Sequence, residues 1–289
     1  MKKFVISIAA ILMSGNIHAQ EDGILVTKNY YDRLPVISQN IEWQRDVYRE
    51  IDLRKNVNSG LFVVQNNQNL LTRIFEHIVN GDIKAYEFAI NRNEEFTDAN
   101  VIKLKNILDD YHINYKKNAA LSSSDIDIPT DEVLSYYIKE SVIYDKVNGR
   151  YRIFVDAVCP VINREDDFND KIVKYPLFWV KLKDIAPYID DIEIYANDVN
   201  MATRMNVYDY FTLNLYQGDI YKVFNPAGNT LNQKVNSEEQ LKAERKRIEE
   251  DLHKVRRHTF DTFYENKTSN LEESASSARV AEKRNITKK

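Results

Sequence analysis

The sequence predicts an α+β fold: a mainly helical N-terminal part, an antiparallel sheet built on a long central hairpin, and a charged C-terminal helix with a disordered tail. Three patterns predict it. Residues 135–162 alternate apolar and polar side chains around Asn148-Gly149, which is typical of a β-hairpin. Residues 41–112 repeat apolar side chains at helical spacing. Residues 237–258 combine dense charge with a thin apolar stripe.

The first 19 residues have the pattern of a secretory signal peptide. Lys2 and Lys3 precede a short apolar run, and small residues lead to a cleavage site between Ala19 and Gln20. A membrane anchor is the alternative, but the run has only half of the roughly 20 apolar residues that a spanning helix needs. No cysteine follows the run to carry a lipid. We therefore expect membrane association only through partners. Residues 20–40, after the signal peptide, are predicted to form an extended lead-in.

The charge balance argues against a nucleic-acid binder. The chain of 289 residues has 40 basic and 44 acidic side chains, and removing Lys2 and Lys3 leaves 38 against 44, a net charge of −6. Its single cysteine, Cys159, excludes an internal disulfide. An exported chain without disulfides indicates a Gram-negative periplasm.

Residues 41–116 are predicted to be mainly helical. Trp43, Val47 and Ile51 lie four positions apart and would form one stripe of a helix over 41–56. A second helix would be capped by Asn66 or Asn67, with Gly81 at its C-terminal end. The polar, serine-rich stretch 117–132 is predicted to be a linker.

Residues 133–235 are predicted to form the sheet region. With Asn148 and Gly149 as a two-residue turn, Glu140 would face Ala157, and Val142 would face Val155. One face of the hairpin is then apolar apart from Glu140; its other members are Tyr136, Ile138, Val142, Tyr144, Ile153, Val155, Ala157 and Cys159. The other face is mixed, and we expect a helix of this chain or a partner to cover its apolar members, Tyr137, Ile143, Phe154 and Val158.

Residues 236–289 are predicted to form a charged helix and a disordered tail. Ser237 and Gln240 make a capping box. Leu241, Ile248, Leu252 and Val255 mark a stripe that suits a helix on a surface or against a partner.

The sequence lacks the patterns of common catalytic and cofactor sites. No glycines cluster to cradle a phosphate, no Cys/His spacing suits zinc, and no G-x-S-x-G occurs. The acidic run 166–170 lacks the spacing of an EF-hand, so a solvated loop is favoured over a calcium site. We expect no metal, no cofactor and no catalytic residue.

Glu140 is the exception, because a carboxylate on an apolar face must be paired or have its pKa raised by burial. We favour a structural buried acid paired with an arginine from residues 45–54. The alternative is a periplasmic hydrolase that uses Glu140 with Asp145 or Asp156. The predicted register places both of those acids on the opposite face of the hairpin.

Three ordered stretches carry a family resemblance. They are WQRDVYREIDLRKNVN at 43–58, YYIKESVIYDKVNGRYRIFVDAVCPVINREDDF at 136–168, and YPLFWVKLKDIAPYI at 175–189 together with MATRMNVYDYFTLNLYQGDIYKVFNPAGNTL at 201–231. In this order, after a signal peptide, they resemble the GldN/PorN family of the type IX secretion and gliding motility machinery. None is a catalytic fingerprint, and the tail after residue 236 does not share in the resemblance.

The resemblance implies a non-enzymatic structural subunit of the periplasmic ring of the type IX secretion system. Family members assemble with copies of themselves and with a GldK/PorK-type outer-membrane lipoprotein, and they contact the periplasmic part of a GldM/PorM-type motor protein. Protein secretion across the outer membrane depends on them, as does gliding where the cell glides. We therefore expect a periplasmic chain held at the outer membrane by its lipoprotein partner.

A ring subunit would meet its partners through the predicted 43–54 helix, the mixed face of the hairpin and the 237–258 helix. Ordinary packing within one chain is the alternative for each surface, and a soluble periplasmic binding module that forms no ring is the alternative for the chain. The candidate contact residues are Trp43, Arg45, Arg49, Arg54, Tyr137, Phe154 and Leu252.

Overall fold

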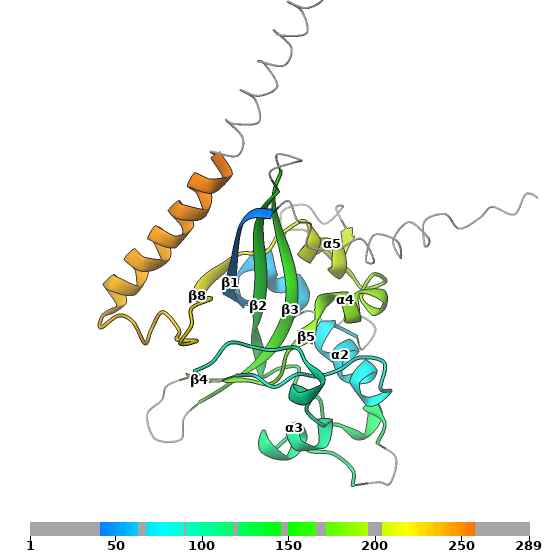
Figure 1. The fold of residues 1–289 in the computed structure, drawn as a ribbon. Coiled ribbons are helices and arrows are strands. Elements are labelled where there is room, and N and C mark those ends of the chain that lie inside the picture. Colours follow the sequence, from blue (N-terminus) through cyan, green and yellow to red (C-terminus); the bar gives the residue numbers. More distant parts are fainter. Residues whose placement is uncertain are drawn as a thin grey trace, which may run out of the picture. The chain divides into compact units, whose positions relative to one another are not determined.

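Two long strands, β2 and β3, form the centre of an antiparallel sheet (Figure 1). The sheet has the order β4-β3-β2-β1-β8, and β5 also pairs with β3. Its strands are β1 (Ile41–Asp52), β2 (Val133–Asp145), β3 (Arg150–Glu165), β4 (Ile172–Pro176), β5 (Val180–Lys181) and β8 (Gly218–Val223). The predicted hairpin is therefore confirmed.

The computed structural model describes residues 41–62, 68–89, 91–117, 121–145, 150–165, 172–195 and 204–257. The predicted signal peptide with its Ala19–Gln20 cleavage site, the lead-in, the Asn148-Gly149 turn, the acidic run 166–170 and the tail beyond 257 lie outside these residues.

Helices surround the sheet and complete the predicted α+β class (Figure 1). The α-helices are α2 (Leu70–Val79), α3 (Leu104–Asp110), α4 (Leu182–Ile185) and α5 (Val207–Thr212), and residues 238–257 form the charged helix near the C-terminus. The short 3₁₀ helices are η1 (Asn56–Leu61), η2 (Asp98–Asn100), η3 (Ser123–Asp125) and η4 (Ala186–Tyr188). Strands β6 (Glu193–Tyr195) and β7 (Arg204–Asn206) form a separate two-stranded sheet.

The helix predicted over 41–56 is wrong, because residues 41–52 form β1 between β2 and β8. Side chains four apart share a face in a strand as well as in a helix, so the spacing of Trp43, Val47 and Ile51 fits both structures. Tyr48 decides between them. Val47 and Tyr48 are both fully buried, but in different clusters on opposite faces of the sheet. Successive side chains point to opposite faces in a strand, so this burial fits a strand that is covered on both faces.

The hairpin register differs from the prediction by two residues near the turn. The ladder closes at Asp145 and Arg150, so Val142 faces Ile153 and Glu140 faces Val155. Four residues rather than two thus connect the strands. A β-bulge then leaves Asp156 without an opposite residue, because Lys139 faces Ala157.

This bulge moves Ala157 and Cys159 off the face on which they were predicted. Both are buried on the aromatic face, which we define by Tyr48, Tyr86, Phe88, Phe96, Tyr137, Ala157, Cys159, Trp179 and Tyr221. Tyr137 lies 4.3 Å from Tyr221 and 6.0 Å from Phe88 between ring centroids. Tyr221 of β8 and Phe88 therefore lie against Tyr137, where a helix of this chain or a partner was expected.

The opposite face carries the C-terminal helix. Leu241, Ile248 and Leu252 of residues 238–257 pack against the helix-covered face, which we define by Val47, Val142, Ile220, Val223 and Leu231. Three of the four residues in the thin stripe predicted from the sequence are thus buried within this chain, and Val255 is partly buried.

The ends of α2 show how local sequence sets a boundary. Asn69 caps the helix, because its side chain accepts a hydrogen bond from the backbone N–H of Thr72. The predicted caps Asn66 and Asn67 lie outside the described residues. Gly81 follows the helix with φ +80°, the left-handed conformation expected at that position.

Candidate functional site

Glu140 lies at the centre of a buried polar network. Its side chain is 1% exposed, and both carboxylate oxygens accept hydrogen bonds of 2.9 Å from Nε of Arg49 on β1. The hydroxyl of Tyr216 donates a third hydrogen bond of 2.8 Å. The structure thus pairs Glu140 with an arginine from residues 45–54, the segment to which the sequence argument assigned its partner.

Arg49 extends the network to the C-terminal helix. Its Nη1 and Nη2 atoms bond the carboxylate of Glu249, and Nη1 also donates to the carbonyl oxygen of Gly218 at 3.3 Å. One guanidinium therefore connects β1, β2, the start of β8 and the helix 238–257. Because its donors point in fixed directions, it also sets the position of that helix on the sheet.

Burial raises the pKa of Glu140, although the charge of Arg49 opposes the rise. Burial and the nearby Glu140 charge also raise the pKa of Tyr216 well above its ordinary value. A general acid or base must reach the reacting proton, whereas this carboxylate is enclosed and fully hydrogen-bonded. The geometry therefore suits a structural pair.

The acid pair required by the hydrolase alternative is not formed. Asp156 binds Lys139 at 2.9 Å and accepts a hydrogen bond of 2.6 Å from Ser141. Lys139 and Ser141 flank Glu140 in β2 and so project from the opposite face. Asp145 is the last residue of β2, five positions beyond Glu140. The Glu140 carboxylate thus faces away from that of Asp156.

The candidate contact residues divide between the surface and the interior. Arg54 is 58% exposed and pairs with Asp52 at 2.8 Å. Leu252 is 4% exposed and packs inside the chain. The remaining five are partly buried: Trp43, Arg45, Arg49, Tyr137 and Phe154. Among the seven, the structure brings Trp43 and Leu252 together in the helix-covered cluster.

Sequence reasoning missed a second buried ion pair. Nζ of Lys222 on β8 lies 3.1 Å from Oε2 of Glu94, and the two side chains are 3% and 1% exposed. Lys222 also donates to the carbonyl oxygen of Arg92 at 2.8 Å and lies 4.7 Å from the ring centroid of Tyr48. Glu94 belongs to an irregular loop, so no periodicity could have indicated its burial.

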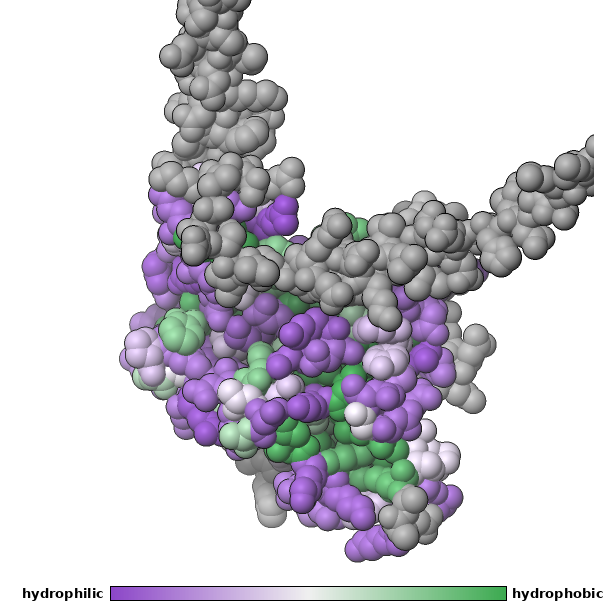
Figure 2. All heavy atoms as spheres, turned by 45° about the vertical axis from the view of Figure 1, so that its right-hand side comes forward, coloured by the Kyte–Doolittle hydropathy of each residue, from purple (hydrophilic) through white to green (hydrophobic). Residues whose placement is uncertain are grey.

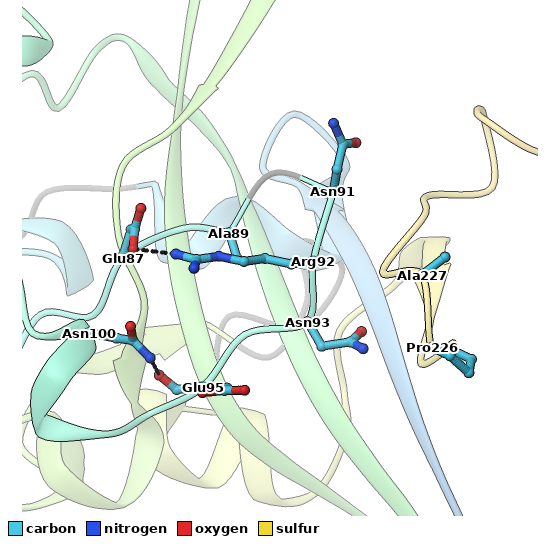
Figure 3. Close-up of a pocket in the computed structure, with 9 residues that line it drawn as sticks. All are labelled: Glu87, Ala89, Asn91, Arg92, Asn93, Glu95, Asn100, Pro226 and Ala227. Atoms are coloured by element: carbon cyan, nitrogen blue, oxygen red, sulfur yellow. Dashed lines mark hydrogen bonds and ion pairs between the residues drawn. The ribbon is translucent and has the colours of Figure 1, made fainter.

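The loop that Lys222 holds also forms one wall of a surface pocket (Figure 3). The turn at residues 225–228 forms the other wall, and the cavity measures about 280 Å³. Its lining is mainly polar: Glu87, Ala89, Asn91, Arg92, Asn93, Glu95, Asn100, Pro226 and Ala227. Figure 3 shows Arg92 turned toward Glu87, with which it forms an ion pair.

The described residues contain neither a cluster of metal ligands nor a helix that could span a membrane. No three His, Cys, Asp or Glu side chains among them gather to hold a metal ion. None of the helices in the described ranges is both long and apolar enough to span a bilayer.

The comparison with protein families identifies the chain. Residues 36–261, which are 226 of the 289, match the family model described as gliding motility associated protein GldN. The chain belongs to the GldN family. The match includes β1, the hairpin and the helix 238–257, and so it contains every residue of the Glu140 network. No curated protein matches the chain.

Membership confirms the resemblance drawn from the three sequence stretches. It also establishes the coarse function, a protein associated with gliding motility. The GldN description names a cellular process rather than a reaction.

Proposed function

We propose that this GldN-family chain is a non-enzymatic structural subunit of a periplasmic ring in the type IX secretion system. Family membership over residues 36–261 is the observation that carries the proposal. In this role the chain binds copies of itself and a GldK/PorK-type outer-membrane lipoprotein. It also contacts the periplasmic part of a GldM/PorM-type motor protein. The ring supports protein secretion across the outer membrane, and gliding where the cell glides.

The structure supports assembly through its exposed apolar side chains. Leu213 is 62% exposed, Leu215 is 41% exposed and Phe224 is 54% exposed. Large apolar groups that stay in water favour contact with another surface. Figure 2 shows one side of the molecule, where hydrophilic residues predominate and hydrophobic ones gather mainly below the centre.

The loop that carries the two leucines is fixed in place, which suits a contact surface. Asn214, between them, donates a hydrogen bond of 3.3 Å to the carbonyl oxygen of Ile153 on β3. Its side-chain oxygen lies 2.9 Å from the hydroxyl of Tyr216, which donates to Glu140. A rigid loop loses little conformational entropy when a partner binds it.

Co-purification from envelope extracts tests the proposal. Affinity-tagged chain should elute with an outer-membrane lipoprotein in a particle many times the mass of one chain. Leu213→Glu should reduce that particle while leaving circular dichroism unchanged, because Leu213 is mostly exposed. Lys105→Glu, at an exposed position of α3 outside the candidate contact surfaces, is the matched control. A monomer free of lipoprotein would instead identify a soluble binding module and reject the ring.

A further inference from the structure

Two amide side chains that line the pocket of Figure 3 donate hydrogen bonds to the backbone around it. Nδ2 of Asn93 donates to the carbonyl oxygen of Asn225 at 2.9 Å. Nδ2 of Asn100 donates to the carbonyl oxygen of Glu95 at 3.0 Å. An amide side chain has its acceptor at the opposite end, so both residues keep an oxygen for another partner.

Two of the remaining groups at the pocket are open hydrogen-bond acceptors, whereas the side-chain oxygen of Asn91 already accepts a hydrogen bond of 2.5 Å from Nε2 of Gln233. The side-chain oxygen of Asn93 is buried and accepts no hydrogen bond from the described residues. The carboxylate of Glu95 is exposed and forms no ion pair within the described ranges. Among the described residues that line the pocket, Arg92 is the one cation, and it is paired with Glu87. The pocket therefore favours a ligand that carries many donors and positive charge.

The frame of the pocket is rigid. Behind the wall, Lys222 holds Glu94 and the carbonyl oxygen of Arg92. In front, Gly228 lies so close that a Cβ atom there would meet the Arg92 backbone at 2.4 Å. The two walls are thus held at a fixed separation before a ligand arrives.

We propose that this pocket binds the guanidinium group of an arginine side chain presented by a polypeptide. A guanidinium has five donors in one plane, no acceptor, and weaker hydration than an ammonium group. Its planar fork can donate to several acceptors at once, here the carboxylate of Glu95 and the amide oxygens of Asn93 and Asn100. Ala89, Pro226 and Ala227 supply apolar surface for the methylene stem of the side chain.

The charge of the chain outside the described residues is compatible with such a ligand. Residues 279–289 contain five basic side chains, two of them arginines, and one acidic side chain. A peptide with this sequence, from the same or another copy, is therefore one source of the guanidinium. The inference does not depend on ring assembly, since binding is measured on the isolated chain.

Nuclear magnetic resonance of the ¹⁵N-labelled mature chain tests the proposal. N-acetyl-arginine amide should shift the side-chain amide signals of Asn93 and Asn100. Glu95→Gln should weaken this binding about fivefold, which corresponds to roughly 1 kcal/mol. Glu239→Gln, an exposed acid on the C-terminal helix, is the matched control and should bind as the unaltered chain does.

Three further probes distinguish the source of the cation. N-acetyl-lysine amide tests an ammonium group, spermidine tests a free polyamine, and a peptide of residues 279–289 tests a polypeptide. The proposal holds if the peptide binds at least as tightly as N-acetyl-arginine amide and both bind more tightly than the lysine amide and spermidine. It is overturned if the Asn93 and Asn100 signals do not move, if Glu95→Gln changes nothing, or if spermidine binds most tightly.

Discussion

Arg49→Met would remove the cation that neutralises Glu140 while keeping most of the side-chain volume. Glu140 is 1% exposed and Arg49 is 12% exposed, so the substitution leaves a buried carboxylate without its partner. Breaking a buried pair in this way costs about 3–5 kcal/mol of unfolding free energy. Loss of the bond to Glu249, which is 37% exposed, adds little, because partly exposed pairs contribute only about 0–1 kcal/mol.

The loss in Arg49→Met should shrink as the pH falls. Burial raises the folded-state pKa of Glu140 above its ordinary value, and removing Arg49 raises it further. A carboxyl with a raised folded-state pKa lowers stability as pH rises through that pKa, so acid restores stability. Between pH 7 and pH 5 the recovery is at most about 2.7 kcal/mol, or about 1.4 kcal/mol for each pH unit.

Urea unfolding at pH 7 and pH 5 measures both effects. Glu140→Gln in the Arg49→Met background removes the buried charge, so the double variant should be more stable at pH 7 than Arg49→Met alone. Arg54→Met, at an exposed position just after β1, should change stability by no more than about 1 kcal/mol. The reasoning fails if Arg49→Met costs no more than Arg54→Met, or if the double variant is as unstable as Arg49→Met.

Three other outcomes follow from the fold. Lys222→Met leaves Glu94 buried without its cation, and urea unfolding should show a loss of about 3–5 kcal/mol. Gly228→Ala should lower the melting temperature more than Gly81→Ala. Both glycines have positive φ, where an alanine costs about 1–2 kcal/mol of stability. Only at Gly228 would the new Cβ atom also meet backbone atoms. Cys159 is fully buried and burial raises the pKa of its thiol, so a maleimide should label it only in urea. Labelling of the folded chain at the unfolded rate would contradict its burial.

The central hairpin could be predicted because its alternation continues over more than twenty residues. Its register could not, because the bulge at Asp156 and the four-residue connection leave no mark in the apolar pattern. The first strand was mistaken for a helix for a related reason. Apolar residues four apart satisfy both periodicities, and the choice depends on the partners β2 and β8, which lie far away in the sequence.

The two buried polar sites also differ in how far the sequence could predict them. Glu140 could be singled out because a charge within a strongly apolar face needs compensation. The choice of Arg49 over the neighbouring arginines comes from the strand pairing. The Lys222–Glu94 pair joins a strand to an irregular loop 128 residues away, so neither residue stands out from its own neighbours.

The contact between Arg49 and Glu249 joins residues 200 positions apart in the chain. Strand β1, near the beginning of the described chain, needs β8 and the last described helix to complete its surroundings. A chain that has emerged only as far as residue 217 leaves one edge of β1 unpaired and its helix-covered face open. Such a protein cannot complete its core while its C-terminal part has still to emerge. Folding therefore has to wait for the final quarter of the polypeptide, and contacts of this separation make it slow.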